Sequence, residues 1–289
     1  NIAWRNAPGC NSGSVMQYIV SSLIVISRQK GFNLKDKTIG IVGVGNVGTK
    51  VARACEILGM RVLLNDPPRE KEEKGGKFVD LETIKQETDI ITFHTPLTKE
   101  GELRTYHLAD DSFFSSLKKK PIIINSARGG IIDTEAIKRA IRTERISGAI
   151  IDCWENEPVI NLDYMNMVDI ATPHIAGYSA DGKANATRMS LASIADFYGL
   201  DKSIINSIKE PAPIASIIDL SKFIQSDNRI YDAILKTYNP IGDSSRLKAS
   251  PGTFKQLRNN YPLRREYLAY KAENASLAEL EVLSGLGFR

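Results

Sequence analysis

Three stretches of the sequence hold side chains that could move a proton and bind an anion: Asn125–Gly130 with Arg128, Asp152–Pro158 with Glu157, and Pro173–Gly177 with His174. An imidazole titrates near neutral pH, so His174 could take the proton of an alcohol as hydride leaves the same carbon. A carboxylate beside it, which we assign to Glu157, would fix the tautomer of His174 and stabilise the imidazolium. The planar guanidinium of Arg128 suits a carboxylate and an adjacent carbonyl oxygen. The set predicts the oxidation of a 2-hydroxy acid.

Each of these residues also has a structural interpretation. An Arg before two glycines can bind helix carbonyls or a surface acid, and a single His after Pro is more often structural. All three stretches follow predicted strands, however, and α/β sheets bind ligands at the carboxyl ends of their strands. This shared position favours catalysis, with Glu157 and His174 paired in space although they lie 17 residues apart.

A glycine turn earlier in the chain predicts a dinucleotide site. The run Gly43-Val44-Gly45-Asn46-Val47-Gly48 follows the apolar segment Ile39–Val42 and leads directly into a helix. Its glycines permit a tight turn, close approach to a pyrophosphate and close packing of the helix. The N–H groups at the helix start favour an anion. The residues expected to contact the cofactor here are Gly43, Gly45, Asn46, Val47 and Gly48.

Asp66 closes the next predicted strand, 18 residues after Gly48. A carboxylate at this point can accept both ribose hydroxyls and would repel a 2′-phosphate, which favours NAD over NADP. Arg69 nearby weakens that preference slightly. The alternative is a tight glycine turn without a ligand and an aspartate on the surface. Because strand, glycines, helix and acid are all in register, we favour the NAD site.

The surrounding pattern alternates strand and helix, which predicts a parallel, doubly wound α/β sheet of the Rossmann type. The expected strands are 38–42, 61–65, 89–94, 121–125, 149–152 and 168–171. The expected helices are 14–28, 47–58, 81–86, 134–143 and 182–198. We divide the chain into the end of a substrate domain with a crossing helix (1–33), an NAD-binding domain (34–175), a return to the substrate domain (176–205) and a small C-terminal α+β domain (206–289).

Composition limits the functional classes. Of 289 residues 42% are hydrophobic and 25% charged, as in an ordinary globular protein. A net charge of +4, spread along the chain, gives no reason to expect nucleic acid. Cys10, Cys55 and Cys153 have neither metal-ligand spacing nor a disulfide framework, so we expect no metal and a cytoplasmic location. No apolar stretch suggests a membrane span or signal peptide.

The combined motifs resemble those of the D-isomer-specific 2-hydroxyacid dehydrogenases. The matching residues are the glycine turn with Asp66, His94–Thr98, Asn125–Gly129, Glu157-Pro158 and Pro173–Gly177. The resemblance implies that Arg128 binds the substrate carboxylate, that Glu157 supports His174 and that His174 is the acid/base. It also implies cofactor contacts from Thr95, Asp152 and Gly177, and a substrate contact from Tyr178.

One branch of that family, which acts on a phosphorylated hydroxy acid, is the most similar. The shared segments are Pro8–Asn11, His174–Ser179, Gly182-Lys183, Tyr238–Pro240, Asp243, Asn260–Glu266 and Leu283–Phe288. The resemblance implies that the C-terminal domain mediates a homodimer. Donors from Tyr178, Ser179 and Lys183 would suit a phosphate, although Lys183 could equally be a solvated helix residue.

The resemblance also has consequences for the start of the chain, for three further residues and for the alternative functions. Family members begin with half of a substrate domain that this chain lacks, so we expect a missing N-terminal part whose substrate contacts cannot be assigned. His94, His107 and Cys153 are interpreted as structural. The alternatives to a phosphorylated substrate are another D-2-hydroxy acid, such as lactate, glycerate or 3-phosphoglycerate, or a non-catalytic NAD(H)-sensing regulator on the same fold.

Overall fold

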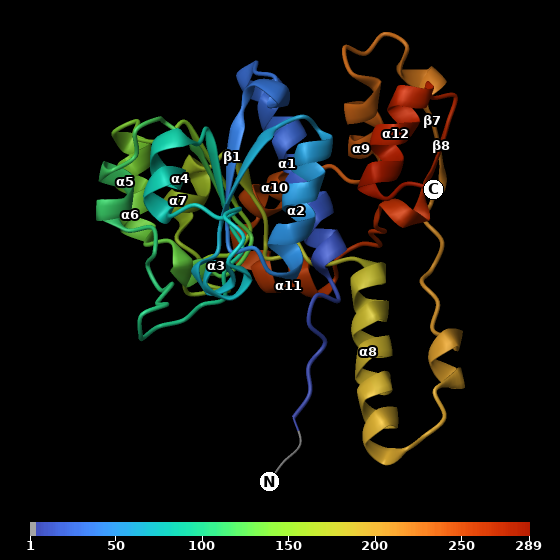
Figure 1. Cartoon of the computed structure of the whole chain (residues 1–289). Helices are drawn as coiled ribbons and strands as arrows, with labels where there is room; N and C mark the ends of the chain where they lie inside the picture. The colour runs from blue at the N-terminus through green and yellow to red at the C-terminus, as the bar shows by residue number, and fades with distance from the viewer. Residues whose placement is uncertain (1–3) are drawn as a thin grey trace. The chain divides into compact units, whose positions relative to one another are not determined.

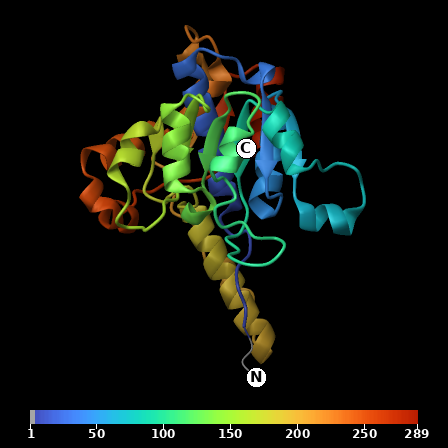
Figure 2. The same ribbon diagram turned by 90° about the vertical axis from the view of Figure 1, so that its left-hand side faces the viewer.

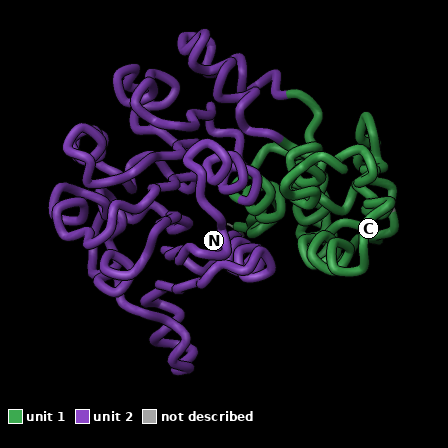
Figure 3. The backbone as a smooth tube through the Cα atoms, turned by 90° about the horizontal axis from the view of Figure 1, so that it is seen from above, with its two compact units in different colours: residues 1–19, 177–238, 262–289 green, residues 20–176, 239–261 purple. Residues whose placement is uncertain are grey.

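The computed structural model describes residues 4–289, so the first three residues of the predicted 1–33 segment lie outside it. The chain forms two compact units (Figure 3). Unit 1 contains residues 4–19, 177–238 and 262–289, and unit 2 contains residues 20–176 and 239–261. Helix α1 (Ser12–Lys30) is continuous and passes from unit 1 into unit 2.

Unit 2 is built on a six-stranded parallel sheet with the order β2-β1-β3-β4-β5-β6. Its strands are β1 (Thr38–Val42), β2 (Arg61–Asn65), β3 (Ile90–Phe93), β4 (Ile122–Asn125), β5 (Gly148–Ile151) and β6 (Ile170–Ala171). The first two have the predicted bounds and the others lie within two residues of theirs. β1, β3 and β4 are buried at every position, as expected for apolar strands covered on both faces. The predicted Rossmann-type sheet is confirmed.

Helices cover both faces of this sheet. Helices α4 (Leu81–Glu87), α5 (Asp111–Ser115) and α6 (Thr134–Arg142) lie on one face of the sheet (Figures 1 and 2). Helix α2 (Asn46–Ile57) lies on the other face (Figure 1). Asp80, which precedes α4, accepts a hydrogen bond from the third backbone N–H of its helix. Asp110 and Asp133 do the same for α5 and α6, and such caps define where the helices begin.

Several short helices were not predicted. Before residue 206 these are α3 (Pro67–Glu73), α5 and α7 (Leu162–Met167), and the 3₁₀ turns at 34–36, 129–131 and 203–207. Beyond residue 206 the prediction gave only an α+β composition without bounds, so none of the helices there was placed, including the 3₁₀ turns at 220–223, 251–253 and 267–269. None of the three α-helices exceeds seven residues, which is too short to display a clear apolar periodicity. The local signals were the capping residues Asp66, Asp110 and Asn161, and for α3 also the prolines Pro67 and Pro68 in its first turn.

The C-terminal region is divided differently from the predicted 206–289 domain. Helices α10 (Pro240–Ala249) and α11 (Phe254–Asn259) belong to unit 2. The Ser244 hydroxyl accepts the N–H of Ala171 in β6 at 3.1 Å, and Lys248 donates to the carbonyl of Val168 at 2.7 Å. These bonds attach α10 to the last strand of the sheet.

Unit 1 contains α8 (Ala180–Tyr198) and a small α+β module. The module has the parallel strands β7 (Ile217–Asp219) and β8 (Lys271–Glu273) with helices α9 (Arg229–Thr237) and α12 (Leu277–Leu286). α8 begins two residues earlier than predicted. Among the described residues, no helix is both long and apolar enough to cross a membrane.

Candidate active site

The glycine turn lies at the topological switch point of the sheet. After β1 the chain moves outward to β2 and then returns to β3 on the other side of β1, and open α/β sheets bind ligands at such a point. Gly43, which follows β1, has a φ of +90°, and a Cβ there would lie 2.7 Å from the backbone nitrogen of Thr95. Only glycine fits this approach.

The next two glycines have opposite surroundings. A Cβ on Gly45 would meet no atom within 4 Å, whereas one on Gly48 would lie 2.0 Å from the carbonyl oxygen of Gly43. Gly45 is the N-cap of α2 and provides no side-chain acceptor. The first N–H groups of a helix lack partners within it, so those of Asn46 and Val47, next to the open space at Gly45, are suited to bind a pyrophosphate.

Asp66 connects the end of β2 to this turn. Its Oδ2 accepts the N–H of Val44 at 2.7 Å, and its Oδ1 accepts the N–H of Arg69 at 3.1 Å. Each carboxylate oxygen retains a lone pair for a ribose hydroxyl. The Nε of Arg69 donates to Glu73 at 2.6 Å, which ties this cation to a carboxylate of its own helix.

Two hydroxyl groups at the carboxyl edge of the sheet fit a bound cofactor. The buried hydroxyl oxygens of Thr95, after β3, and of Ser126, after β4, have no hydrogen-bond partner within residues 4–289. Buried polar groups without partners are rare in folded proteins. The open space at Gly45, the free N–H groups of α2 and these hydroxyls fit a dinucleotide.

The predicted pairing of His174 and Glu157 is present in unit 2. His174 Nδ1 lies 2.7 Å from Glu157 Oε2, and Glu157 Oε1 accepts the N–H of Trp154 at 2.8 Å. Both side chains are about a quarter exposed (26% and 21%), so the pair is accessible to a small ligand. The carboxylate orients the ring so that Nδ1 carries the proton and Nε2 can accept one.

Asp152 fixes the backbone on both sides of His174. The carboxylate is almost fully buried (1% exposed) and accepts the Thr172 hydroxyl at 2.6 Å. It also accepts the N–H groups of Ile175 at 2.8 Å and Ala176 at 2.9 Å. Burial raises the pKa of Asp152. Since His174 has a φ of +56°, these bonds hold its residue in a conformation that few side-chain-bearing residues adopt.

Arg128 follows β4 and lies on the loop next to the one that carries Glu157. Its Nη1 donates to the carbonyl of Ala127 at 2.7 Å, and its side chain is exposed. A Cβ on Gly129 would lie 1.9 Å from the carbonyl oxygen of Trp154, so the two loops touch backbone to backbone.

Cys153 lies among the same charged groups. Burial raises the pKa of its thiol well above the usual value, with smaller effects of Asp152, Glu157, Arg128 and Arg258. Its sulfur, a Glu157 oxygen and a His174 nitrogen lie within 4.8 Å of one another. Zinc binds thiolates, but burial keeps this thiol protonated, which agrees with its interpretation as a small buried side chain.

The sequence did not reveal the role of Glu155. Its Oε2 accepts the N–H and hydroxyl of Thr134 at 3.0 and 2.7 Å, and its Oε1 pairs with His107 Nε2 at 2.8 Å. The Nδ1 of His107 lies 3.3 Å from Asp133. This cluster joins the loops after β3, β4 and β5, and His107 is structural as predicted. The only available signal was the density of acids around Trp154.

The remaining predicted site residues, Gly177 for the cofactor and Tyr178, Ser179 and Lys183 for the substrate, lie in unit 1. Gly177 packs on Asn11, because a Cβ would lie 2.2 Å from Asn11 Nδ2. The ammonium of Lys183, an exposed residue, lies 5.2 Å from the centre of the Tyr178 ring. Ser179 differs from the prediction. It is 2% exposed, and its hydroxyl caps α8 through the N–H of Gly182 at 2.8 Å, so it is not free to bind a phosphate.

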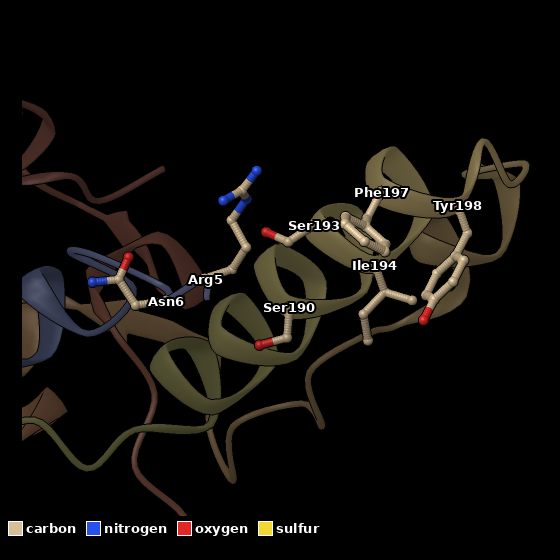
Figure 4. A pocket seen from close by; sticks show the side chains of 7 residues that line it. All are labelled: Arg5, Asn6, Ser190, Ser193, Ile194, Phe197 and Tyr198. Carbon is tan, nitrogen blue, oxygen red and sulfur yellow. The ribbon is translucent and has the colours of Figure 1, made fainter. Parts of the chain in front are cut away.

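A surface hollow of about 470 Å³ also lies in unit 1 (Figure 4). Its lining residues are Arg5, Asn6, Ser190, Ser193, Ile194, Phe197 and Tyr198. It contains none of the predicted site residues and has no acid/base pair. The Glu157–His174 pair lies instead in unit 2.

The switch point of the sheet, the glycine turn with Asp66 and the Glu157–His174 pair are typical of a dinucleotide-dependent dehydrogenase of the α/β class. Residues 21–176 match the family model of the D-isomer specific 2-hydroxyacid dehydrogenases, NAD binding domain. The chain belongs to this family, and its cofactor is NAD. Residues 211–287 match a domain of unknown function (DUF3410).

Curated relatives are similar over most of the chain. Erythronate-4-phosphate dehydrogenase of Bacteroides thetaiotaomicron is 55% identical over 93% of this chain and 75% of its own length. The enzyme of that name from Porphyromonas gingivalis is 44% identical over 99% of this chain and 78% of its own length. These matches confirm the predicted resemblance to a phosphate-specific branch.

Solved structures agree on the fold. The NAD-dependent formate dehydrogenase of Staphylococcus aureus, in complex with NAD, has a TM-score of 0.58 at 25% identity, covering 68% of this chain and 66% of its own. The D-lactate dehydrogenase of Lactobacillus jensenii, solved with NAD⁺, has a TM-score of 0.53 at 25% identity, covering 70% and 69%.

Proposed function

We propose that this protein catalyses the NAD-dependent oxidation of 4-phospho-D-erythronate to (R)-3-hydroxy-2-oxo-4-phosphooxybutanoate, a step of pyridoxal 5′-phosphate synthesis. The observation that carries the proposal is the 2.7 Å contact between His174 Nδ1 and Glu157 in the unit that also contains the glycine turn. The names of the relatives, which are 44% and 55% identical, support the choice of substrate.

NAD, when bound, supplies the acceptor for the hydride that leaves C2. The Nε2 of His174 takes the proton of the C2 hydroxyl in the same reaction, which balances the loss of one hydride and one proton. The ring then carries a positive charge, and Glu157 stabilises it through Nδ1–H. Arg128 binds the substrate carboxylate and polarises the forming carbonyl through its planar donors.

The cofactor contacts follow from the same site. We assign the pyrophosphate to the turn formed by Gly43, Gly45, Asn46, Val47 and Gly48, and the ribose hydroxyls to Asp66. We also assign Thr95 to the cofactor, because its buried hydroxyl has no hydrogen-bond partner among the described residues. Asp152 and Gly177 complete the proposed set.

Tyr178 and Lys183 are the proposed substrate residues beyond the reacting carbon. A phenol hydroxyl and an ammonium can both donate to phosphate oxygens. The ammonium of Lys183 lies 5.2 Å from the Tyr178 ring, so the two donors are close enough to share one anion.

The test is NAD reduction with five acids: 4-phospho-D-erythronate, D-erythronate, D-lactate, D-glycerate and 3-phosphoglycerate. We expect the highest kcat/KM with 4-phospho-D-erythronate. A higher value for any unphosphorylated acid would overturn the substrate assignment while leaving the family intact. Absence of turnover with every acid, combined with NADH binding, would instead support a regulatory protein.

We also propose a homodimer and a cytoplasmic location. Ile224, Leu268 and Leu277 of the C-terminal module are 75%, 65% and 87% exposed, and each could pack against a second copy. The three cysteines are unpaired, which suits a reducing compartment. Light scattering should give twice the protomer mass, and Leu277→Glu should reduce it to the protomer mass.

A further inference from the structure

Three polar side chains from distant parts of the sequence meet in unit 1. The hydroxyls of Ser14 and Ser179 lie 2.6 Å apart, and they lie 2.7 and 3.0 Å from Glu266 Oε1. Ser14 is in α1, Ser179 caps α8, and Glu266 belongs to the region matched by the domain of unknown function. This triangle connects that domain to the residue after Tyr178.

A second set of bonds attaches the same two segments. The guanidinium of Arg265 donates to both oxygens of Asp181 at 2.9 and 3.0 Å, and Asp181 also accepts the N–H of Glu266 at 2.9 Å. The N–H of Ala180 donates to the carbonyl of Arg264 at 2.9 Å. Residues 179–181 are therefore held by three consecutive residues of the C-terminal segment.

The packing around Glu266 leaves little room for movement. A Cβ on Gly13 would lie 2.1 Å from Glu266 Oε2, so the carboxylate rests directly on the backbone of α1. Ser14 is fully buried and Asp181 is 8% exposed. Burying carboxylates costs free energy unless each is hydrogen-bonded, and such networks fix one geometry more strictly than apolar packing does.

The residues that this network immobilises lie next to the proposed phosphate ligands. Tyr178 directly precedes Ser179, and the N–H of Lys183 donates to the Ser179 carbonyl at 3.2 Å. A shift of the α8 cap would move both side chains together. Neither Glu266 nor Arg265 needs to touch the substrate for this effect.

We propose that Glu266, assisted by Arg265, is a positioning residue that holds Tyr178 and Lys183 in the geometry that binds the substrate phosphate. The C-terminal module thus contributes directly to substrate affinity, in addition to any role in self-association. This inference rests on the proposed function of Tyr178 and Lys183.

The experiment compares Glu266→Ala with Glu266→Gln and with Glu279→Ala. Glutamine retains an oxygen that can accept the serine hydroxyls. Glu279 is a matched control in the same module, where it caps α12 through Ser276 and pairs with Arg229 at 3.3 Å. Four quantities are measured: KM and kcat for 4-phospho-D-erythronate, NADH affinity, and hydrogen exchange of the amides of residues 177–183.

We expect Glu266→Ala to raise KM about tenfold, the scale of one lost charge-assisted hydrogen bond, with kcat and NADH affinity unchanged. Amide hydrogen exchange of residues 177–183 should accelerate in Glu266→Ala. Glu266→Gln should restore most of the wild-type KM and most of the wild-type exchange rate. Glu279→Ala should lower the melting temperature but change neither KM nor the exchange of residues 177–183. An unchanged KM in Glu266→Ala, or an equal KM increase in Glu279→Ala, would overturn the proposal. If the wild type does not oxidise 4-phospho-D-erythronate, the proposed function is wrong. Unchanged hydrogen exchange of residues 177–183 in Glu266→Ala would instead overturn the positioning role of Glu266, whatever the substrate is.

Discussion

Gly129 packs so tightly on Trp154 that a Cβ would lie 1.9 Å from the Trp154 carbonyl oxygen and 2.5 Å from the nitrogen of Glu155. Gly129 follows Arg128, and Trp154 donates its N–H to Glu157 at 2.8 Å. This single backbone contact therefore sets the distance between the proposed carboxylate-binding side chain and the partner of His174.

Gly129→Ala should lower kcat/KM by about a hundredfold or more. The added methyl must push the two loops apart, and a displacement of about 1 Å can cost that much in catalysis. NADH binding should weaken far less than kcat/KM falls, because the glycine turn and Asp66 lie on other strands, and only Ser126 and Asp152 are near the displaced loops. Steady-state kinetics and NADH fluorescence titration measure the two effects.

Gly130→Ala is the matched control. There the Cβ would first meet the Tyr106 ring at 3.3 Å, and a side chain can move where a backbone cannot. Activity in Gly130→Ala should remain within a few-fold of the wild type. Equal losses in the two variants would show that the contact with Trp154 is not the cause.

Gly45→Ala and Gly48→Ala should separate cofactor binding from folding. The space in front of Gly45 is open, so its variant should fold with a small change in melting temperature but bind NADH roughly tenfold or more weakly, because the methyl occupies the proposed pyrophosphate position. In Gly48→Ala the methyl would lie 2.0 Å from the Gly43 oxygen, and the fold should lose about 1–3 kcal/mol or more. Thermal unfolding with and without NADH distinguishes them, and wild-type affinity in Gly45→Ala would contradict the assignment.

Glu157→Gln should reduce kcat by roughly two to four orders of magnitude while leaving NADH affinity unchanged. An amide can donate to Nδ1, which favours the tautomer with the proton on Nε2, and it cannot stabilise the imidazolium. Glu144→Gln is the control. The Glu144 side chain is exposed and lies 3.3 Å from Lys120, so this variant should have the kcat of the wild type. A kcat for Glu157→Gln within threefold of the wild type would remove His174 and Glu157 from the mechanism.

The sequence was sufficient for the parts of the site that depend on local pattern and sheet geometry. β1 and β2 are apolar runs with clear ends, so the turn at Gly43 and the acid at Asp66 could be placed to the residue. His174 and Glu157 could be paired because both follow strands of one parallel sheet. Their 2.7 Å contact confirms that pairing.

What the sequence could not provide are contacts between segments far apart in the chain. Glu266 meets Ser14 across 252 residues, and nothing near either residue indicates the other. The same limit explains Ser179, whose hydroxyl was expected to face a ligand but is committed to the α8 cap. The attachment of α10 to β6 through Ser244 is a third case, because a composition change near residue 206 does not show which unit a later helix joins.

His94 should make the stability of unit 2 sensitive to mild acid. Burial lowers the pKa of His94 from 6.5 to about 3, and its Nε2 lies 3.0 Å from the Thr92 hydroxyl. Between these two pH values the unfolded chain binds a proton that the folded chain does not, so the free energy of unfolding falls as pH falls below 6.5. The slope from this residue is at most about 1.4 kcal/mol per pH unit.

His94→Gln removes the titrating group and retains a polar atom for Thr92. Between pH 6.5 and 5 the free energy of unfolding should therefore fall less in His94→Gln than in the wild type, by up to about 2 kcal/mol. Thr92→Val removes the hydrogen bond but no titrating group, so it should lower stability at every pH and keep the wild-type slope. Urea unfolding at several pH values in this range measures all three proteins. Parallel curves for the wild type and His94→Gln would show that His94 is protonated in the folded state, and that its ring is not desolvated at the end of β3.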